Sequence, residues 1–392
     1  MSGPLSGVRI VDLTTQVLGP LASQTLGDMG ADVIKVEMQG GDPIRRQGGP
    51  ARHPEMSALF LTLNRNKRSI RLDLKLPRCR AVLGRLVETA DVFMHNMRPK
   101  AAAKLQISYA DVVKSNPNVI YASASGFGSK GRFKDRPAYD DIIQGASGVA
   151  ALNAGPDGVP RYLPMLMVDK LAGIYFASAI SMALFARERT GKGQEIHVPM
   201  FETMVSFNMV EHLWGGVFGT PEAGLGYRRL FTRRPFATSD GHVCIMASTD
   251  RQWQRLFELF GLPHLASDER FETRANRTKH IDALYEIVAA KIRERSTAEW
   301  LALLEQADIP SGPIKNLKDL WDDSYLKEIH FYREFEHPTE GKLYMTDIPF
   351  FFSATPGSIN RGPPRLGQDT AEILQEAGYS KAEISDLIIS LG

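Results

Sequence analysis

The sequence predicts an α/β protein built on a parallel β-sheet that is covered by helices. Short runs rich in β-branched residues alternate with longer segments whose apolar residues recur at helical spacing. The chain opens with a strand at residues 8–13, a helix from residue 19, and a second strand at residues 31–37. A unit of this kind places two parallel strands in one sheet. Continued alternation along the chain is typical of a covered parallel sheet.

The elements of the first half follow from local signals. The first helix begins at Gly19 and Pro20, because proline suits the first helical turn, and Gly30 suits the end of that helix. Runs of β-branched residues and helical apolar spacing continue to alternate up to residue 218. Further strands are expected at residues 69–74, 91–95, 118–123 and 194–199, and further helices at residues 78–90, 169–189 and 200–218.

The second half has a different character. Residues 219–233 are rich in glycine, arginine and turn residues, and we interpret them as a linker. Beyond it, Ser239, Asp240 and Gly241 form a hairpin signal between strands at 236–238 and 242–246. The remaining elements are helical. Helices are expected at residues 251–260, 280–293 and 297–307, the last capped by Thr297, and at residues 370–378 and 381–391.

Charge and cysteine content exclude several classes of function. Lysine and arginine total 47 against 45 acidic residues, and the net charge of +2 argues against a general nucleic-acid binder. Two cysteines cannot form a disulfide framework or a cysteine-based zinc site. The nine histidines contain no HxxxH or HxH pair, so we expect no metal site. The low cysteine content favours a reducing, cytoplasmic location.

No segment has the features of a signal or a membrane span. Residues 1–7 lack a basic and an apolar signal region. The longest uncharged apolar run covers residues 171–186, whereas about 20 residues are needed to cross a bilayer. We therefore expect this run to be a buried helix, and we expect no contact with a membrane.

A basic run lies between Arg65 and Arg80. It holds seven lysine or arginine residues and one acid, an excess of +6 in a chain that totals +2. One interpretation is a solvated surface. The other is a site for a phosphorylated ligand, since the run flanks a strand end, where α/β proteins bind ligands. Arg98 and Lys104 would add further phosphate-binding cations.

Residues Gly126 to Gly131 spell a GxGxxG motif directly after a strand. A dinucleotide site requires this loop to open a helix whose N-terminus holds the pyrophosphate. Pro137 follows shortly and would break such a helix. We therefore interpret the motif as a backbone loop.

Asp169 stands at the start of the most apolar helix. An acid at this position can cap the helix, which is a structural role. A carboxylate can also attack a thioester and form an anhydride, which is a catalytic role. The residues by themselves leave both roles open. In either role we expect an ionised carboxylate near neutral pH, because the helix dipole and the backbone amides favour the anion.

Several residue runs resemble one enzyme family, the class III coenzyme A (CoA) transferases, which include formyl-CoA transferase and carnitine CoA-transferase. The resemblance covers the whole chain, in order. The matching runs are GVRIVDLT at 7–14, GP at 19–20, GADVIKVE at 30–37, NRNKRS at 64–69, LDLK at 72–75, NMRP at 96–99, SGFG at 125–128, PAYD at 137–140, the spaced set Gln144, Ala146, Ser147 and Gly148, and GKGQ at 191–194.

The resemblance implies a function for Asp169, which, with Gly173 four positions on, matches the family's catalytic aspartate. The implied activity moves CoA from an acyl-CoA thioester to a free carboxylic acid through a covalent aspartyl intermediate. CoA and acyl-CoA are then substrates, and no prosthetic group is required. This activity would make Asp169 a nucleophile and not merely a helix cap.

The resemblance also implies an architecture. The large Rossmann-like α/β domain would comprise residues 1–218, completed by residues 330–392, and the small α+β domain would comprise residues 234–320. Residues 219–233 would link the two, and residues 321–392 would return to the large domain and end in helices that pack on it. Two ring-shaped chains would thread through each other as an interlocked homodimer.

The family's CoA contacts carry over unevenly. Met38 lacks a charge that some members use, and Arg45, Arg71 or Lys75 would replace it. The glycine-rich lid of formyl-CoA transferase has no counterpart at residues 244–252, which argues against oxalate as the acceptor. The expected CoA-binding residues are Val17, Leu18, Met38, Arg71, Leu72, Asp73, Leu74, Lys75, Asn96, Met97, Arg98, Lys104, Pro137, Ala138, Tyr139 and Asp140.

Two alternative functions remain open. The α-methylacyl-CoA racemases of the same superfamily use a His–Asp pair, but Tyr139 occupies the histidine position, and tyrosine, with a reference pKa of about 10, is a poor base at neutral pH. A non-catalytic CoA-binding protein would keep the scaffold alone. Arg228, Arg229, Arg233 and Arg234 crowd the linker, where they either bind a second carboxylate of a dicarboxylic acid or face solvent.

Overall fold

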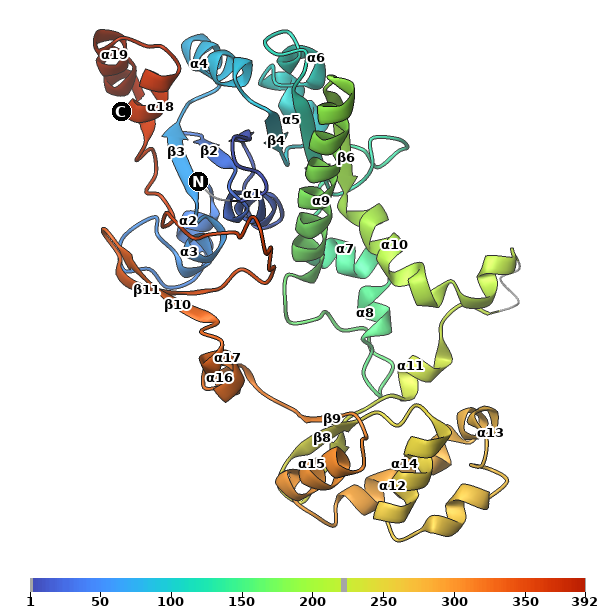
Figure 1. Ribbon diagram of the computed structural model, residues 1–392. Coiled ribbons are helices and arrows are strands. Elements are labelled where there is room, and N and C mark those ends of the chain that lie inside the picture. Colours follow the sequence, from blue (N-terminus) through green and yellow to red (C-terminus); the bar gives the residue numbers. More distant parts are fainter. Residues whose placement is uncertain (1–2, 220–223, 392) are drawn as a thin grey trace. The chain divides into compact units, whose positions relative to one another are not determined.

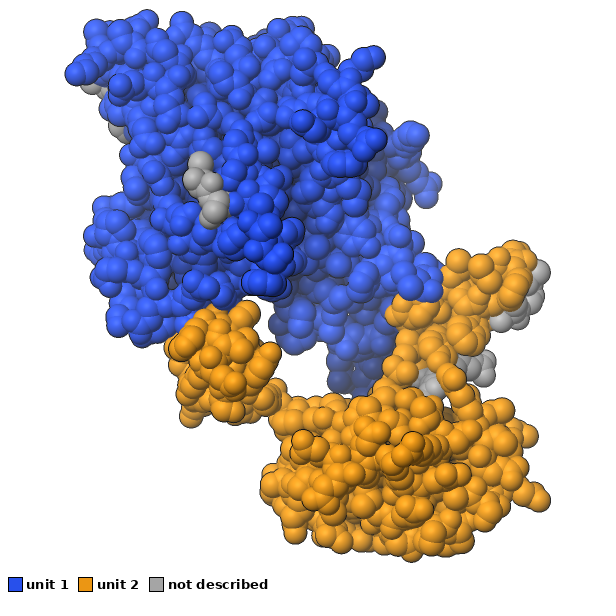
Figure 2. All heavy atoms as spheres, in the orientation of Figure 1, with its two compact units in different colours: residues 1–210, 332–392 blue, residues 211–331 orange. Residues whose placement is uncertain are grey.

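The computed structural model describes residues 3–219 and 224–391, and its contacts divide the chain into two compact units (Figure 2). The large unit comprises residues 1–210 and 332–392, and the small unit comprises residues 211–331. The linker predicted at residues 219–233 includes residues 220–223, which lie outside the described residues.

A six-stranded parallel sheet forms the centre of the large unit (Figure 1). Its strand order is β3-β2-β1-β4-β5-β6, and each neighbouring pair is parallel. The predicted α/β class with a parallel sheet is therefore confirmed. The strands are β1 (Arg9–Asp12), β2 (Asp32–Glu37), β3 (Lys67–Arg71), β4 (Val92–His95), β5 (Ile120–Ser125) and β6 (Gln194–Pro199).

One predicted strand is shifted. We expected a strand at residues 69–74, whereas β3 begins at Lys67 and ends at Arg71. The side chains of Lys67 and Arg68 are buried against acidic and carbonyl partners, so two charged residues lie inside the strand. A prediction from hydrophobicity excludes such residues, because lysine and arginine are rarely buried without partners.

Helices cover both faces of the sheet, as a buried parallel sheet requires. Ile10 of β1 points into a core with one group of helices, and its neighbour Val11 points into a second core on the opposite face. The first group is α1 (Leu18–Asp28), α7 (Asp140–Ala146), α8 (Val149–Leu152), α9 (Met167–Thr190) and α10 (Met200–His212). The second group is α4 (Pro77–Glu88), α5 (Pro99–Lys104), α6 (Tyr109–Val112), α18 (Thr370–Glu376) and α19 (Lys381–Leu391).

Helix α9 is the longest helix of the large unit. It is long and apolar enough to cross a membrane by length and composition alone. Its core-facing residues Ala172, Phe176 and Ile180 are nevertheless buried against the sheet and its neighbouring helices. This face is buried as expected from the apolar run at residues 171–186, whereas Ile174, Met182 and Phe185 of the same run are exposed, so the prediction of a buried helix is confirmed only in part.

The C-terminal segment covers the free edge of the sheet at β3. Asn66 donates its backbone N–H to Arg361 O and accepts from the backbone N–H groups of Asn360 and Arg361 at its side-chain oxygen. Ser69 donates its backbone N–H to the Asp369 carboxylate. These bonds protect an edge strand that would otherwise expose unpaired backbone groups.

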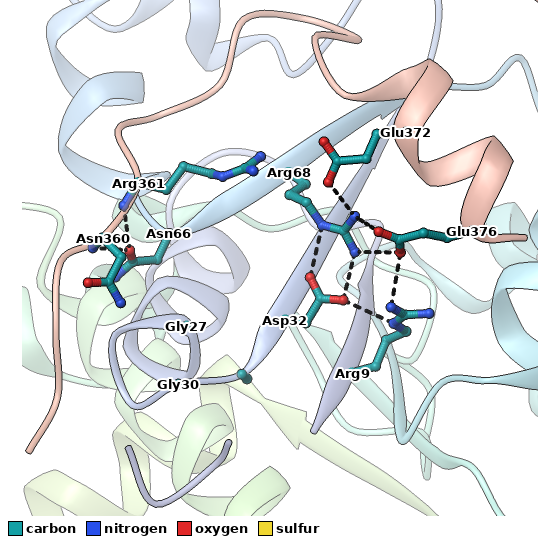
Figure 3. Close-up of a pocket in the computed structure, with 11 residues that line it drawn as sticks. Arg9, Gly27, Gly30, Asp32, Asn66, Arg68, Asn360, Arg361, Glu372 and Glu376 are labelled. Atoms are coloured by element: carbon teal, nitrogen blue, oxygen red, sulfur yellow. Dashed lines mark hydrogen bonds and ion pairs between the residues drawn. The ribbon is translucent and has the colours of Figure 1, made fainter. Parts of the chain in front are cut away.

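Ion pairs reinforce this attachment at the amino ends of the strands (Figure 3). Arg68 lies between Asp32 and two glutamates of α18, Glu372 and Glu376, at 2.7–3.1 Å. Arg9 bridges Asp32 and Glu376 at 3.0 Å each. A cavity of about 400 Å³ lies here, and these acidic and basic groups neutralise one another across it.

The small unit has its own core of apolar side chains packed around a three-stranded sheet in the order β7-β8-β9. The hairpin predicted at Ser239 to Gly241 is confirmed by antiparallel pairing of β7 with β8. The predicted cap Thr297 is wrong, since Ser296 caps the helix and forms a capping box with Glu299. The elements are β7 (Phe236–Ala237), β8 (His242–Ile245), β9 (Ser311–Pro313), α12 (Asp250–Leu259), α13 (Arg274–Lys279), α14 (Ile281–Ile292) and α15 (Thr297–Gln306).

The shorter elements complete the chain. The hairpin of β10 and β11 was not predicted, because its strands are mostly polar and exposed. The remaining elements are α2 (Ile44–Gln47), α3 (Ala58–Leu63), η1 (Trp214–Phe218), α11 (Arg228–Thr232), η3 (Pro263–Ser267), α16 (Leu317–Trp321), α17 (Ser324–Glu328), β10 (Tyr332–His337) and β11 (Gly341–Thr346).

Candidate active site

A cavity of about 380 Å³ lies outside the carboxyl ends of the parallel strands. Thr15 and Gln16, which follow β1, form one wall, and Asn96 and Met97, which follow β4, form another. The chain places β2 and β3 on one side of β1 and then crosses to β4 on the other. Ligands of open α/β sheets bind at this point of reversal. The topology therefore marks this cavity as the candidate active site.

Some of the predicted site residues meet in this cavity, and Asp169 is one of them. The segments after β1, β4 and β5 and the first turn of α9 supply them, although they are distant in sequence. The predicted residues that line the cavity are Leu18, Asn96, Met97, Arg98, Pro137, Ala138, Tyr139 and Asp169.

Asp169 is the third residue of α9 and does not cap it. The residue before the helix is Leu166, which makes no side-chain capping bond. The backbone N–H of Asp169 instead donates to Oδ1 of Asp140 at 2.9 Å. Among residues 3–219 and 224–391 the Asp169 carboxylate has no hydrogen bond or ion pair. The interpretation of Asp169 as a structural cap is therefore wrong.

The pKa of Asp169 is raised to about 7. Burial is the largest cause, and the negative charges of Asp140 and Asp141 contribute to the same rise. We expected an ionised carboxylate near neutral pH, because the helix dipole favours the anion. Burial and like charges outweigh that effect. The carboxylate therefore titrates near neutral pH.

Gly173 allows α9 to approach α1 closely. A Cβ atom at this position would lie 2.7 Å from the carbonyl oxygen of Leu18, which is too short for a van der Waals contact. Leu18 itself lines the cavity, and Gly173 lies one helical turn beyond Asp169. The glycine thus brings the nucleophile candidate and the wall after β1 together.

The GxGxxG segment forms a loop, as predicted, and does not open a helix. Gly126 lies on the cavity wall, where an added Cβ would collide with the Ala138 side chain. The backbone N–H of Gly128 donates to Oε1 of Glu202 at 2.9 Å, so it does not face a ligand in the cavity.

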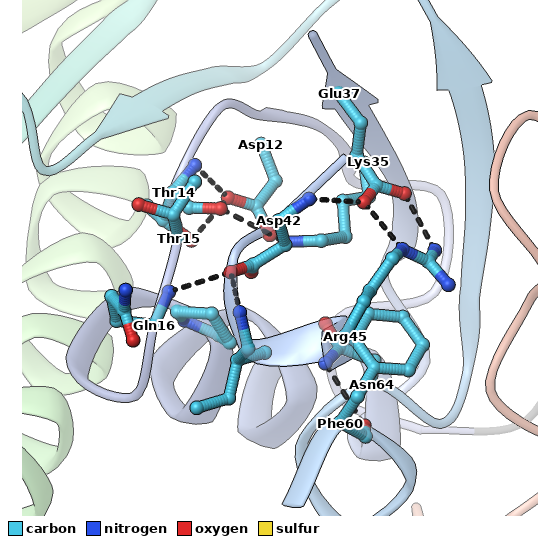
Figure 4. Close-up of polar contacts among 12 residues, drawn as sticks. Asp12, Thr14, Thr15, Gln16, Lys35, Glu37, Asp42, Arg45, Phe60 and Asn64 are labelled. Carbon is cyan, nitrogen blue, oxygen red and sulfur yellow. Dashed lines mark hydrogen bonds and ion pairs between the residues drawn. The ribbon is translucent and has the colours of Figure 1, made fainter. Parts of the chain in front are cut away.

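A buried network of charges fixes the loop after β1 (Figure 4). Asp12 accepts from the backbone N–H of Thr14 at 2.7 Å, and Asp42 accepts from that of Gln16 at 3.0 Å. Lys35, which is fully buried, donates to Thr14 O at 2.8 Å and to Asp42 at 3.0 Å. The left-handed backbone of Gln16, with φ of 69°, is held by these bonds.

Arg45 belongs to the same network and does not face the cavity. It is fully buried, makes two bonds of 2.7 Å to the Glu37 carboxylate and stacks on Phe60. Burial opposes the charge of Glu37, but the bonds and charge of Arg45 outweigh it and lower the pKa of Glu37 to about 2. The expectation that Arg45 replaces a missing cation at Met38 is therefore wrong.

Several cations of the predicted basic run between Arg65 and Arg80 form ion pairs or hydrogen bonds inside the protein. Arg65 pairs with Asp28 at 2.7 Å, and Arg68 pairs with Asp32 at 2.7 Å. Lys67 is fully buried and donates to backbone and amide oxygens. Three of the seven cations are therefore held by partners inside the protein. A phosphate site formed by the other cations of the run, Arg71, Lys75, Arg78 and Arg80, stays a prediction.

The other predicted CoA-binding residues lie outside the cavity lining and differ in exposure. Lys75 and Lys104 are exposed, while Met38, Arg71 and Asp73 are half-buried. Asp73 accepts from the backbone N–H of Lys75 at 3.0 Å. The buried positions are Val17, Leu72, Leu74 and Asp140.

The loop after β4 is anchored from two sides. Asn96 accepts from Thr15 N and donates to Thr15 O, so it ties this loop to the one after β1. The backbone N–H of Met97 donates to Nδ1 of His95 at 3.1 Å, which leaves Nε2 as the protonated nitrogen toward Tyr121. Burial, with a smaller effect of His197, lowers the pKa of His95 to about 4.

Several lining residues were missed from the sequence, including Ser125, Arg136 and Met200. The Ser125 hydroxyl lies 2.8 Å from Nε2 of His197, a residue of β6. Like Thr15 and Gln16, Ser125 stands at the carboxyl end of a strand, and that position was the signal available in the sequence.

The structure describes the side chains of only two of the four arginines near the linker. The side chains of Arg228 and Arg229 lie outside the described residues. Arg233 and Arg234 both line a separate cavity of the small unit, and Arg234 also pairs with Glu286 at 2.6 Å. In the part of the chain that the structure describes, no three His, Cys, Asp or Glu residues are arranged to hold a metal ion.

Known proteins resemble this chain over nearly its full length. Succinyl-CoA:glutarate CoA-transferase of Mus musculus is 35% identical, covering 99% of this chain and 89% of its own. Succinate–glutarate CoA-transferase of Agrobacterium fabrum is 33% identical, covering 95% of each chain. The crystal structure of a CAIB/BAIF family protein from Brucella suis is 31% identical and superposes with a TM-score of 0.82, covering 96% of this chain and 100% of its own.

The family assignment agrees with these relatives. The model of CoA-transferase family III matches residues 5–370, which includes every strand of the large sheet and Asp169. The chain therefore belongs to CoA-transferase family III, the class III CoA-transferases.

Proposed function

We propose that the protein transfers CoA from an acyl-CoA to a free carboxylic acid and that Asp169 is the nucleophile. The observation that carries the proposal is the Asp169 carboxylate, which lines the cavity at the sheet's reversal point and has no bonding partner among the described residues. With a pKa of about 7, the carboxylate is available as the nucleophilic anion at neutral pH, and no bond to a described residue occupies its lone pairs.

The reaction balances without another reactant. The Asp169 carboxylate attacks the thioester carbonyl, the C–S bond breaks, and the products are a mixed anhydride and CoA thiolate. The thiolate attacks the aspartyl carbonyl, releases the donor acid and leaves an aspartyl-CoA thioester. The acceptor carboxylate attacks this thioester to give a second anhydride and thiolate, and the thiolate then takes the acyl group and frees Asp169.

We propose short dicarboxylic acids as the substrate class. The similar CoA-transferases of Mus musculus and Agrobacterium fabrum are named for succinate and glutarate. Arg98 and Arg136 both line the cavity, so one cation remains for a distal carboxylate when the other meets the CoA phosphates.

We further propose that the protein is a cytoplasmic homodimer whose chains interlock. Apolar side chains of α9 and α10 are exposed in the single chain, among them Met182 at 69%, Phe185 at 65% and Val210 at 82%. Exposed apolar surface of this kind is typical of an interface. Light scattering at micromolar concentration is expected to give twice the chain mass, and a stable, active monomer would refute the dimer.

The test of the proposed function is a matrix of acyl-CoA donors against carboxylic acids, read by mass spectrometry. We expect CoA to move among short dicarboxylates, and we expect Asp169→Asn to abolish transfer while CoA still binds. Transfer by the Asn variant would exclude Asp169 as the nucleophile. If no pair of substrates exchanges CoA, the transferase proposal fails. Deuterium entering the α-carbon of an acyl-CoA would indicate a racemase instead.

A further inference from the structure

Asp140 was expected to contact CoA, but its side chain faces the interior. It is the first residue of α7 and is 4% exposed. One carboxylate oxygen accepts from the backbone N–H of Asp169 at 2.9 Å, and the other accepts from Nε2 of Gln144 at 2.6 Å. Both oxygens are thus engaged, one of them by the nucleophile's own residue.

Gln144 extends this contact along the segment that leads into α9. It is fully buried, one turn after Asp140 in α7. Its Oε1 accepts from Leu163 N at 2.9 Å, and its Nε2 also donates to Met165 O at 3.3 Å. The amide can satisfy these partners in only one orientation, since its NH₂ group must face two acceptors. Side chains of α7 therefore hold this segment at Leu163, Met165 and Asp169.

We infer that Asp140 and Gln144 form a positioning pair for the nucleophile, in which Gln144 orients Asp140 and Asp140 holds the first turn of α9 with a negative charge beside the Asp169 carboxylate. The inference rests on the proposed function of Asp169. Asp140 touches no substrate in this role and acts only through Asp169.

The negative charge of Asp140 has a consequence for reactivity. When Asp169 attacks, its own charge passes to the CoA thiolate and the aspartyl group becomes neutral. Repulsion between the two carboxylates is present before the attack and absent after it, so it favours acylation. The same repulsion raises the pKa of Asp169, with burial as the larger cause. The reactive anion thus forms only toward neutral pH.

Other titratable and charged groups also lie near the Asp169 carboxylate and contribute to its electrostatic environment. Asp141, the next residue of α7, is exposed and raises the same pKa to a smaller degree. Arg98, Arg136 and Tyr139 line the cavity with Asp169. Asp141 makes no hydrogen bond to α9 among the described residues, so it matches Asp140 in charge but lacks its positioning contact.

The experiment measures the rate of Asp169 acylation by an acyl-CoA, without acceptor, between pH 5 and 9. In Asp140→Asn the amide oxygen still accepts from Asp169 N, but the charge is lost and the new NH₂ group no longer accepts from Gln144 Nε2. We expect the acid limb to move down by at least about half a pH unit, because a like charge has been removed. We also expect the plateau rate to fall by about 10- to 100-fold, with CoA affinity unchanged. Asp141→Asn is the matched control, with a smaller shift and a plateau rate close to that of the wild type.

Each outcome decides one half of the inference. An acid limb of Asp140→Asn that moves down by less than about half a pH unit would overturn the electrostatic role. Gln144→Leu tests positioning without removing a charge, and it also serves if Asp140→Asn does not fold. We expect acylation by this variant to be about tenfold slower at the plateau, and a wild-type rate would overturn positioning. If wild-type Asp169 is never acylated, the proposed function fails, and not this inference alone.

Discussion

Gly173 provides a direct test of how closely α9 must approach α1. In Gly173→Ala the new Cβ would lie 2.7 Å from Leu18 O and 3.4 Å from Cδ2 of Leu21, whereas ordinary contacts begin near 3.4 Å. The helices must therefore separate locally by about 0.7 Å. A displacement of about 1 Å in an active site lowers the rate by about 100-fold, so we expect kcat to fall by about 10- to 100-fold.

Overpacking of this kind also destabilises the fold, by about 1–3 kcal/mol. The assay compares kcat, CoA affinity and the urea midpoint of Gly173→Ala with those of Gly145→Ala. Gly145 also lies in a helix, but a Cβ there meets nothing within 4 Å. Gly145→Ala is expected to keep its activity and to gain up to about 1 kcal/mol. Full activity and unchanged stability of Gly173→Ala would refute the reasoning.

Three further predictions address charge. Glu37→Ala should lose about 3–5 kcal/mol of stability in urea, because it leaves Arg45 buried and unpaired. The folded-state pKa of His95, about 4, lies below the ordinary value of 6.5, so the stability that neutral His95 contributes is complete above pH 6.5 and is lost as the pH falls toward 4. The free energy of unfolding of the wild type should therefore drop by about 2 kcal/mol from pH 7 to 5. His95→Gln should lack this part of the pH dependence. Neutralising Lys75 and Lys104 should weaken CoA binding a few-fold at low salt, with the difference vanishing at high salt; equal affinity at low salt would exclude them as CoA contacts.

The strands of the large sheet and the candidate nucleophile were accessible from the sequence, whereas the order of the strands was not predicted. Runs of β-branched residues marked most strands within one or two residues, since a parallel sheet buried on both faces requires them. Asp169 was identified because it begins the most apolar helix and matches a family pattern with Gly173. These signals are local, and local patterns are what a sequence displays directly.

The partners of the charged residues were not accessible in this way. From the sequence alone Arg68 is interpreted as a surface cation, because its partners Asp32 and Glu376 are distant along the chain. Only the return of the C-terminal segment to β3 brings Arg68 and Glu376 together. The same holds for Asp140, which acquires its role from the backbone of Asp169.

The central claim is that Asp169 becomes covalently acylated during turnover. The direct measurement incubates the enzyme with acyl-CoA alone, traps the product with hydroxylamine and maps the modified peptide by mass spectrometry. We predict a mass change on Asp169 that needs no acceptor acid and is absent from Asp169→Asn. A label on Asp140, Glu202 or another acid would contradict the assignment of the nucleophile. Rapid transfer that labels no acid and requires donor and acceptor together would contradict the covalent mechanism itself.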